Sequence, residues 1–172
     1  ITKRAERMYI DMVSRRFNKD YLTARLFTPF GYYDSVIRLI PYVILSIINE
    51  KDPIVKNPND GRDFIFINDV AKLFYEVSKN IEIIGQKTVL NFATGKLTRV
   101  DGIVSELYSI AGLDPPTFSN DMNVPSHSLF ADETETGDLM SKLHIEFSPL
   151  SKGLKNSFDW FKNYRKLYSS II

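Results

Sequence analysis

The sequence predicts an α/β fold with largely parallel strands, and two observations support this prediction. Short apolar stretches typical of buried strands alternate along the chain with segments whose apolar residues recur at helical spacing. The chain has 172 residues, of which 44% are hydrophobic, so it is long enough for one domain with a sizeable core. Strands that alternate with helices favour a parallel sheet that helices cover.

The first part of the chain shows this alternation most clearly. Residues 1–17 carry apolar side chains on one helical face and charged side chains on the other, and a polar break follows. A buried strand is predicted over 21–27, and Pro29 and Gly31 are expected to end it. The elements predicted next are a helix over 35–49, an edge strand at 54–55, a turn over 57–61, a strand over 62–67 and a helix over 70–79 that Asn68 or Asp69 caps.

The second part continues the same pattern. A buried strand is predicted over 88–92, and a helix follows from about residue 100 to 111, with Thr98 as its cap and Gly112 at its end. The remaining expected elements are a short strand over 128–130, a short helix over 133–143 and a final helix over 151–168.

Composition excludes several classes of function. The formal net charge is +1, which argues against a nucleic-acid binder or a polybasic membrane binder, since both need a concentrated positive face. Cysteine is absent, so disulfides, thiol catalysis and cysteine-based metal sites are excluded. The histidines, His127 and His144, are too far apart in the sequence to suggest a metal site, and no apolar run is long enough to predict a membrane span.

Several segments follow one another in an order and spacing that resemble a known enzyme family. They are Thr2-Lys3 at the start of a helix, ARLFTPFG over 24–31, RLIP over 38–41, GRDFIFINDVA over 61–71 and NFATGK over 91–96. The closing segments LFADET and FSPLSKGLKNSFDWF agree with them. Together they resemble the C-terminal half of the extended short-chain dehydrogenases/reductases, and more narrowly the NAD(P)-dependent sugar-nucleotide epimerases, dehydratases and 4-keto reductases.

The resemblance implies the C-terminal part of a Rossmann-type parallel sheet together with a small substrate-binding subdomain. Residues 1–35 would end the dinucleotide-binding part, and residues 36–172 would form mainly the substrate-binding subdomain, with 62–95 returning to the Rossmann part. The family's Gly-rich loop is not found in the sequence. Its Tyr-x-x-x-Lys pattern, with Lys3 as the lysine, places the tyrosine two residues before Ile1. We therefore expect the chain to be about half of a larger enzyme.

The resemblance also assigns roles to individual residues. Lys3 would bind the nicotinamide ribose and lower the pKa of the catalytic tyrosine, because a fixed cation favours the phenolate. The loop over Phe27, Thr28 and Pro29 would face the nicotinamide, and Thr28 would also face the sugar. Arg38 and Arg62 would bind the diphosphate of the substrate, since a guanidinium group binds phosphate oxygens in a bidentate fork.

Each assignment has a structural alternative. Lys3 could be a surface lysine in a first helical turn, and Thr28 could simply begin a loop. Arg62 could form a structural salt bridge with Asp63 or Asp69.

The sequence departs from the family at certain positions. The family commonly has Asn where Thr28 stands, and an aromatic residue beside the nucleotide base where Val55 stands. Met122 falls roughly where many members carry an Arg. Asp132 matches an acidic residue of the family's tail, although it would serve equally well as a helix cap. These departures suggest an unusual nucleotide or sugar.

The function implied by the resemblance is hydride transfer at C4 of a nucleoside-diphosphate sugar, with NAD or NADP as the cofactor and no metal. An NAD(P)H-dependent 4-keto reductase, or a non-catalytic Rossmann-like protein that senses or binds a nucleotide, would be the alternatives. The family resemblance further implies a cytoplasmic enzyme and a homodimer formed through the first helix, whose apolar face includes Met8 and Met12.

Overall fold

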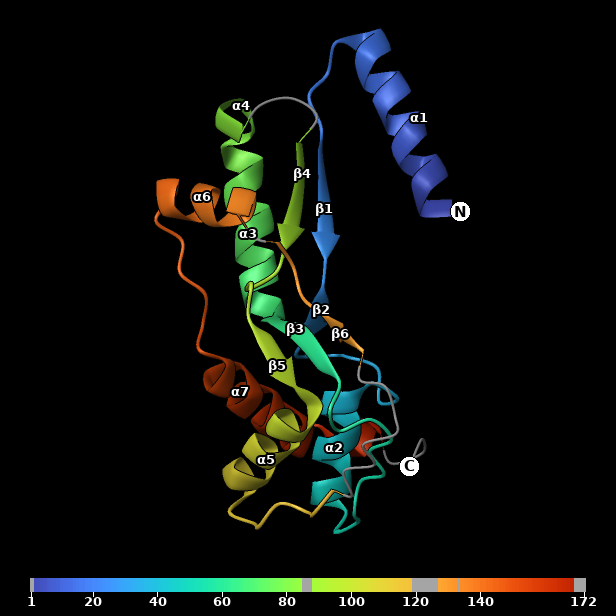
Figure 1. The fold of residues 1–172 in the computed structure, drawn as a ribbon, viewed down its shortest axis with the longest axis vertical. Coiled ribbons are helices and arrows are strands. Elements are labelled where there is room, and N and C mark those ends of the chain that lie inside the picture. Colours follow the sequence, from blue (N-terminus) through green and yellow to red (C-terminus); the bar gives the residue numbers. More distant parts are fainter. Residues whose placement is uncertain (1, 85–87, 119–126, 133, 169–172) are drawn as a thin grey trace.

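The computed structural model describes residues 2–84, 88–118, 127–132 and 134–168. Figure 1 shows an elongated molecule with a strand pair and its helices at one end and a group of helices at the other. The helices are α1 (Thr2–Phe17), α2 (Leu39–Ile48), α3 (Ile67–Lys79), α4 (Ile81–Ile84), α5 (Val100–Ala111), α6 (Thr134–Lys142) and α7 (Leu150–Asn163), and a 3₁₀ turn, η1, spans Arg165–Leu167. The strands are β1 (Leu22–Leu26), β2 (Thr28–Phe30), β3 (Gly61–Phe66), β4 (Thr88–Phe92), β5 (Leu97–Arg99) and β6 (Ser128–Leu129).

The strands form two small sheets that confirm the predicted α/β class. Strands β1 and β4 pair in parallel, from Leu22 opposite Thr88 to Leu26 opposite Phe92. In the second sheet, β3 pairs in parallel with β2 and β6 and antiparallel with β5. Because β2 continues from β1 after a single residue, the chain passes directly from one sheet into the other.

The core consists of two clusters, and β3 contributes to both. The side chains of Phe64 and Phe66 pack with α2, α5 and α7, whereas Ile65 between them packs with α3 and β4. This division follows from the strand geometry, since successive side chains point to opposite faces. Burial on both faces explains the continuously apolar stretch over 64–67, and Figure 1 shows α2, α5 and α7 gathered at the end of the molecule opposite α4.

Gly61 begins β3 at a place where neighbouring strands approach closely. A Cβ atom there would lie 2.6 Å from Leu97 Cδ1 and 2.9 Å from Ser128 Oγ, so a larger residue would push β5 and β6 away. The glycine therefore allows β3 to be paired on both sides directly beside Arg62.

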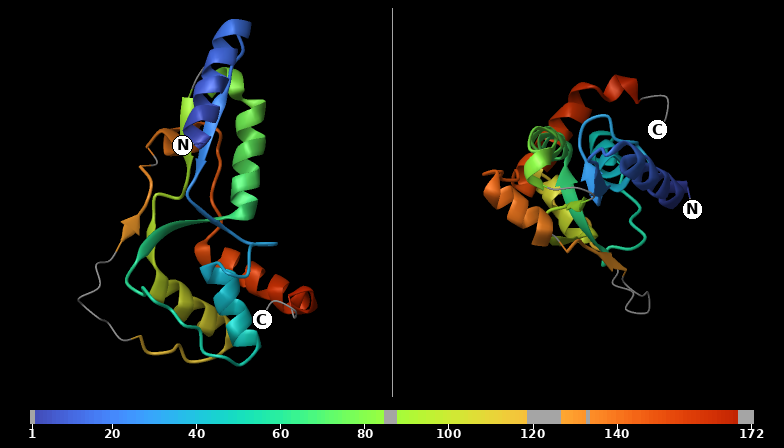
Figure 2. Two further views of the ribbon diagram at one scale, coloured as in Figure 1. Left: turned by 90° about the vertical axis from the view of Figure 1, so that its right-hand side faces the viewer. Right: turned by 90° about the horizontal axis from the view of Figure 1, so that it is seen from above.

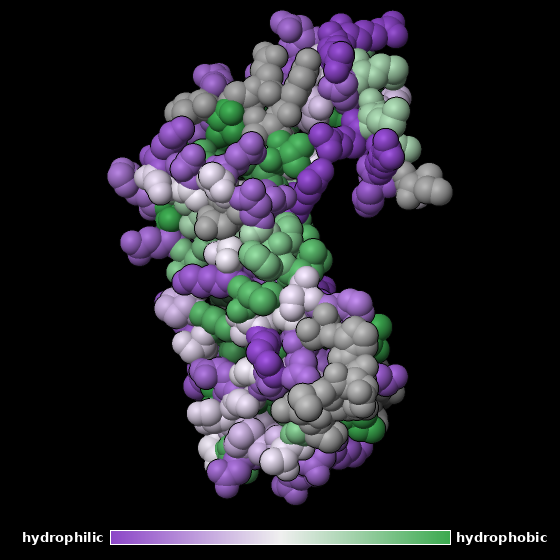
Figure 3. All heavy atoms as spheres, viewed as in Figure 1, coloured by the Kyte–Doolittle hydropathy of each residue, from purple (hydrophilic) through white to green (hydrophobic). Residues whose placement is uncertain are grey.

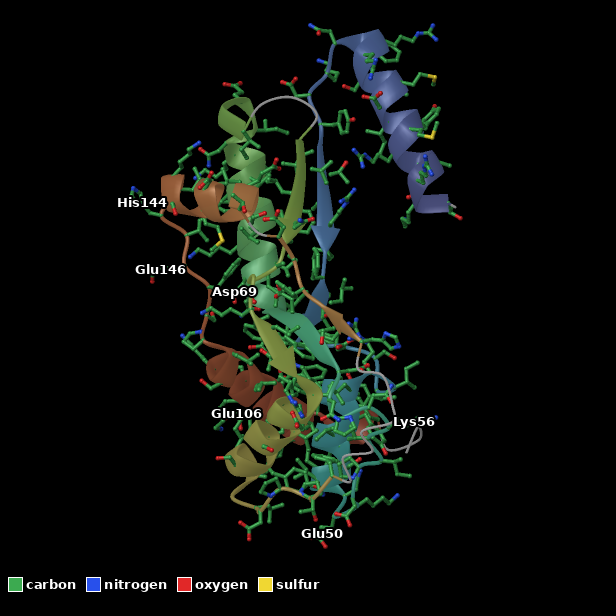
Figure 4. The ribbon with its side chains drawn as sticks, in the orientation of Figure 1. Glu50, Lys56, Asp69, Glu106, His144 and Glu146 are labelled. Atoms are coloured by element: carbon green, nitrogen blue, oxygen red, sulfur yellow. The ribbon has the colours of Figure 1, made fainter. Side chains whose placement is uncertain are left out.

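Several expected elements differ from the structure. No strand forms at 54–55, where the chain is irregular. Helix α3 begins at Ile67, so Asn68 and Asp69 lie inside its first turn and are not caps; instead, Asp69 accepts hydrogen bonds from the backbone N–H and hydroxyl of Ser148 at 3.1 Å each. Figure 4 shows Asp69 at this end of α3, beside the segment that leads to α7.

Other differences arise where strands form by pairing with distant segments. Thr98 lies in β5 and does not cap α5. Pro29 does not end the strand region, because it lies within β2. Since β2 is at the end of the strand order β2–β3–β5, the missing N–H of Pro29 removes no ladder bond on its outer side. Helix α7 ends at Asn163, earlier than expected, and the 3₁₀ turn follows.

None of the helices in the described part of the chain combines the length and the apolar character needed to cross a membrane.

Candidate functional site

Arg62 is the best-defined of the predicted substrate residues. It is the second residue of β3, and its side chain is 33% exposed. Its Nη2 donates to the Asp60 carboxylate at 3.2 Å, and its Nη1 donates to the carbonyl oxygens of Gly61, at 2.8 Å, and of His127. The structural alternative, a salt bridge with Asp63 or Asp69, is wrong in its partner, because Arg62 pairs with Asp60. Sequence reasoning missed Asp60, although an acidic residue two positions before an arginine in a strand lies on the same face.

Asp63 has a different role, because it is fully buried and organises the neighbouring loops. One carboxylate oxygen accepts from the backbone N–H and hydroxyl of Thr94, at 2.8 and 2.7 Å. The other accepts from the N–H of Gly95 at 2.9 Å and of Ala131 at 3.4 Å. Asp63 therefore ties β3 both to the turn after β4 and to the segment after β6.

Arg38 and Pro29 meet in one cavity. A hollow of about 210 Å³ at the end of β2 is lined by residues from the loop after β2, by Arg38 at the N-cap of α2 and by Ile67. Arg38 is paired with Asp34 at 3.5 Å. Burial raises the pKa of the Asp34 carboxyl, and Arg38 opposes this effect only in part. The structure thus brings together a predicted cofactor-facing residue and a predicted substrate residue.

Phe27 and Thr28 lie at the junction between the two sheets. The N–H of Phe27 donates to the carbonyl of Phe92 at 3.3 Å, which extends the β1–β4 ladder by one bond. Thr28 is half-buried at the first position of β2. This junction follows the carboxyl end of β1, which is where α/β sheets bind their ligands.

Lys3 stands apart from the other predicted residues. Its side chain is 92% exposed, and its only partner among the described residues is Glu6, at 2.7 Å in the same helix. Figures 1 and 2 show α1 projecting away from the strands, and the space-filling view in Figure 3 shows an open indentation between α1 and the lower part of the molecule. Lys3 is thus not packed against Thr28, Arg38 or Arg62.

The apolar face of α1 is correspondingly uncovered. Its exposed apolar residues include Met8 at 67%, Tyr9 at 64% and Met12 at 55% exposure, and Ser14 is the helix's buried residue. Pale green atoms along the outer side of α1 in Figure 3 reflect this exposure. A helix with an apolar stripe is usually stabilised by burying that stripe against another element.

Asp132 and Val55 have structural roles. Asp132 accepts from the N–H and hydroxyl of Thr134, at 3.1 and 2.6 Å, so it holds the first residue of α6 in place. The hydroxyl of Thr134 is the main cause that lowers the pKa of Asp132. Val55 is half-buried against the core, and Met122 lies outside the described residues.

The described residues offer no metal site. No group of three or more His, Asp and Glu side chains in this part of the chain could hold an ion. His144 lies in the turn two residues after α6, and Figure 4 shows it and Glu146 at the outer edge of the molecule. The carbonyl oxygen of His127 accepts from Arg62, and its backbone N–H donates to Asp60.

A comparison with sequence models of protein families identifies the family of this chain. The sequence model of the NAD dependent epimerase/dehydratase family matches residues 1–93, which is more than half of the chain. The chain belongs to this family. A comparison with curated protein sequences found no significant match.

Solved structures of NAD-dependent epimerase/dehydratase relatives share the fold. UDP-glucose 4-epimerase from Thermotoga maritima, with UDP-glucose, gives a TM-score of 0.77 at 20% identity over 95% of this chain and 52% of that one. UDP-N-acetylglucosamine 4-epimerase from Methanobrevibacter ruminantium, in complex with UDP-N-acetylmuramic acid, gives 0.78 at 19% identity over 94% and 52%. UDP-glucuronic acid 4-epimerase from Bacillus cereus, in complex with UDP-glucuronic acid and NAD, gives 0.72 at 20% identity over 90% and 49%. The chain therefore spans about half the length of these enzymes.

A solved relative binds NAD, and a site for this cofactor needs donors for the ribose hydroxyls and a turn for the pyrophosphate. The Lys3 ammonium and the Thr28 hydroxyl are exposed or half-exposed donors that suit ribose hydroxyls. In contrast, a strand that leads through a Gly-rich turn into a helix, which is what a pyrophosphate requires, is not found in the described part of the chain. The described part of the chain therefore holds no pyrophosphate-binding turn, and only the family resemblance assigns Lys3 and Thr28 to the nicotinamide ribose.

Proposed function

We propose that this chain is the C-terminal half of an NAD(P)-dependent epimerase or dehydratase that acts on a nucleoside-diphosphate sugar. In this proposal residues 1–35 complete the cofactor-binding part, and residues 36–172 supply mainly the substrate-binding subdomain, with 62–95 returning to the cofactor part. The family match and the half-length coverage of sugar-nucleotide epimerases support it. A 4-keto reductase would use the same half-chain, and the difference would lie in residues outside it.

The observation that supports the proposal most strongly is that Arg62 is held in place and still has N–H donors that its bonds do not use. Its guanidinium group has five N–H donors, and its bonds within the described residues use three of them. The side chain is one-third exposed, so part of it is open to solvent. A guanidinium group that is fixed in place, partly exposed and left with unused N–H donors can bind two oxygens of a phosphate group. This supports Arg62 as the residue that binds the substrate diphosphate.

The other residues would act around this anchor. Arg38, at the cavity it shares with Pro29, would supply a second positive charge, and Thr28 would contact the sugar. When bound, NAD(P) supplies the hydride acceptor for oxidation at C4. Lys3 would bind the ribose and lower the pKa of the catalytic tyrosine, which the Tyr-x-x-x-Lys pattern places two residues before Ile1.

A homodimer formed through α1 belongs to the same proposal. The exposed apolar side chains of Met8 and Met12 support it, because a second copy of α1 would bury them.

The test is a calorimetric titration of UDP-glucose into the full-length protein and its Arg62→Ala variant. Loss of a charge-assisted contact that is one-third exposed should weaken binding by about 2 kcal/mol, or roughly thirtyfold in Kd. Arg16→Ala is the matched control, because Arg16 is exposed at the far end of α1 and should have no effect. Equal affinity of the Arg62→Ala variant and the unmodified protein would refute the assignment.

A further inference from the structure

Asp60 is a buried acidic residue that directly precedes β3, and both of its carboxylate oxygens are used. It is 6% exposed. Its Oδ1 accepts from the backbone N–H of His127 at 2.8 Å, and its Oδ2 accepts from Nη2 of Arg62 at 3.2 Å. One carboxylate therefore connects Arg62 to His127, which lies 67 positions after Asp60 in the sequence.

The same three residues close a ring of contacts. Nη1 of Arg62 donates to the carbonyl oxygen of His127, whose N–H is bound by Asp60. Nη1 also donates to the carbonyl of Gly61 at 2.8 Å. Three acceptors thus hold one end of the guanidinium group, and the Nε–H and one Nη2–H are left for a ligand.

Asp60 is itself rigidly placed, so it can act as a fixed reference for Arg62. Its carbonyl accepts from the N–H of Val100 at 2.9 Å, and its own N–H donates to the carbonyl of Asn57 at 3.2 Å. The nearby Arg99 does not compete for Asp60, because Arg99 forms a two-point pair with Asp101 at 2.6 and 3.1 Å. Asp60 is therefore committed to His127 and Arg62.

We propose that Asp60 is a positioning residue that fixes the guanidinium group of Arg62 for an anionic ligand, the diphosphate of a nucleotide. The inference deepens the proposed function and depends on it for the identity of the ligand. An arginine side chain loses considerable rotamer freedom when it is immobilised. If Asp60 has already removed that freedom, a ligand binds more tightly because it has less ordering to do.

The test combines Asp60→Asn with Arg62→Ala in the full-length protein, with UDP as the probe. Asn keeps one oxygen that can accept from the His127 N–H, but it lacks the charge that holds Arg62. We expect Asp60→Asn to weaken UDP binding by about tenfold, the scale of one charge-assisted hydrogen bond, and to have no further effect when Arg62 is already Ala. Asp101→Asn, which breaks a more exposed Asp–Arg pair nearby, is the matched control and should leave UDP affinity unchanged.

A second readout needs no ligand. Rotation about the Nε–Cζ bond of Arg62, followed by NMR of its guanidinium nitrogens, should be slow in the unmodified protein and fast in the Asp60→Asn variant. If Asp60→Asn leaves both this rotation and the UDP affinity unchanged, or weakens UDP binding equally without Arg62, the positioning role is refuted. If the unmodified protein binds no UDP, the proposed function fails, and the rotation alone decides whether Asp60 fixes Arg62.

Discussion

Removal of the Asp63 carboxylate should destabilise the protein more than any change at an exposed acidic residue. Asp63 is fully buried and accepts from three backbone N–H groups and one hydroxyl. In Asp63→Ala these donors lose their acceptor inside the protein, and each unsatisfied buried donor costs about 1–3 kcal/mol. The Thr94 hydroxyl can turn to another acceptor and the bond to Ala131 is long, so we expect a total of about 3–5 kcal/mol.

The Asp63→Asn variant gives a graded version of the same measurement. One oxygen remains, so about half of the donors stay bound, and the loss should be about 2 kcal/mol. The assay is urea unfolding of the full-length protein, from which the free energy of unfolding is obtained. Asp159→Ala is the control, since Asp159 pairs with Lys155 in an exposed salt bridge that should contribute at most about 1 kcal/mol. A loss below about 1 kcal/mol in Asp63→Ala would refute the reasoning.

Three further predictions concern local structure. His144 has a φ of 51°, so His144→Gly should relieve left-handed strain and, after the entropy cost of glycine, raise the free energy of unfolding by about 0.5 kcal/mol in urea; a loss would contradict this. Burial raises the pKa of Asp34, so the charged form of this residue opposes folding. Asp34→Asn should therefore raise the melting temperature at pH 7, and this gain should disappear as the pH falls below about 4. A gain in melting temperature that does not depend on pH would contradict this cause. In Gly153→Ala the new Cβ would lie 2.9 Å from Phe30 Cζ, so the free energy of unfolding should fall by about 1–3 kcal/mol. Gly102 has open space around it, so Gly102→Ala should raise the free energy of unfolding by about 1 kcal/mol in the same assay. Equal behaviour of the two variants would refute the packing argument.

Local periodicity predicted those elements that are long or continuously apolar. The helix over residues 2–17 and the strand over 88–92 agree closely with expectation, since each carries its full pattern within one segment. The short strands β2 and β5 could not be predicted in this way. They exist because β3 provides pairing partners from far along the chain, and three residues are too few to show a period.

The sequence singled out Arg38 and Arg62 as candidates, but it did not predict the contacts that Arg62 makes. The sequence favoured Arg62, and the structure gives it a fixed, partly exposed position. Asp63, one of the two partners in the alternative interpretation, points to the opposite face of β3 because side chains alternate. Asp60 was missed because its importance depends on His127, which is close only in the fold. Arg38 and Pro29 line one cavity because the loop after β2 turns back, and local sequence patterns do not show this.

The proposed function requires that Lys3 serve catalysis, although its side chain is 92% exposed in this chain. It is tested most directly by the rate at which bound NAD(P) is reduced when UDP-glucose is added to the full-length protein and to its Lys3→Ala variant. We predict a large fall in this rate with unchanged UDP-glucose affinity and an unchanged melting temperature, while Lys19→Ala, at an exposed position just after α1, behaves like the unmodified protein. An unchanged rate in Lys3→Ala would contradict the account.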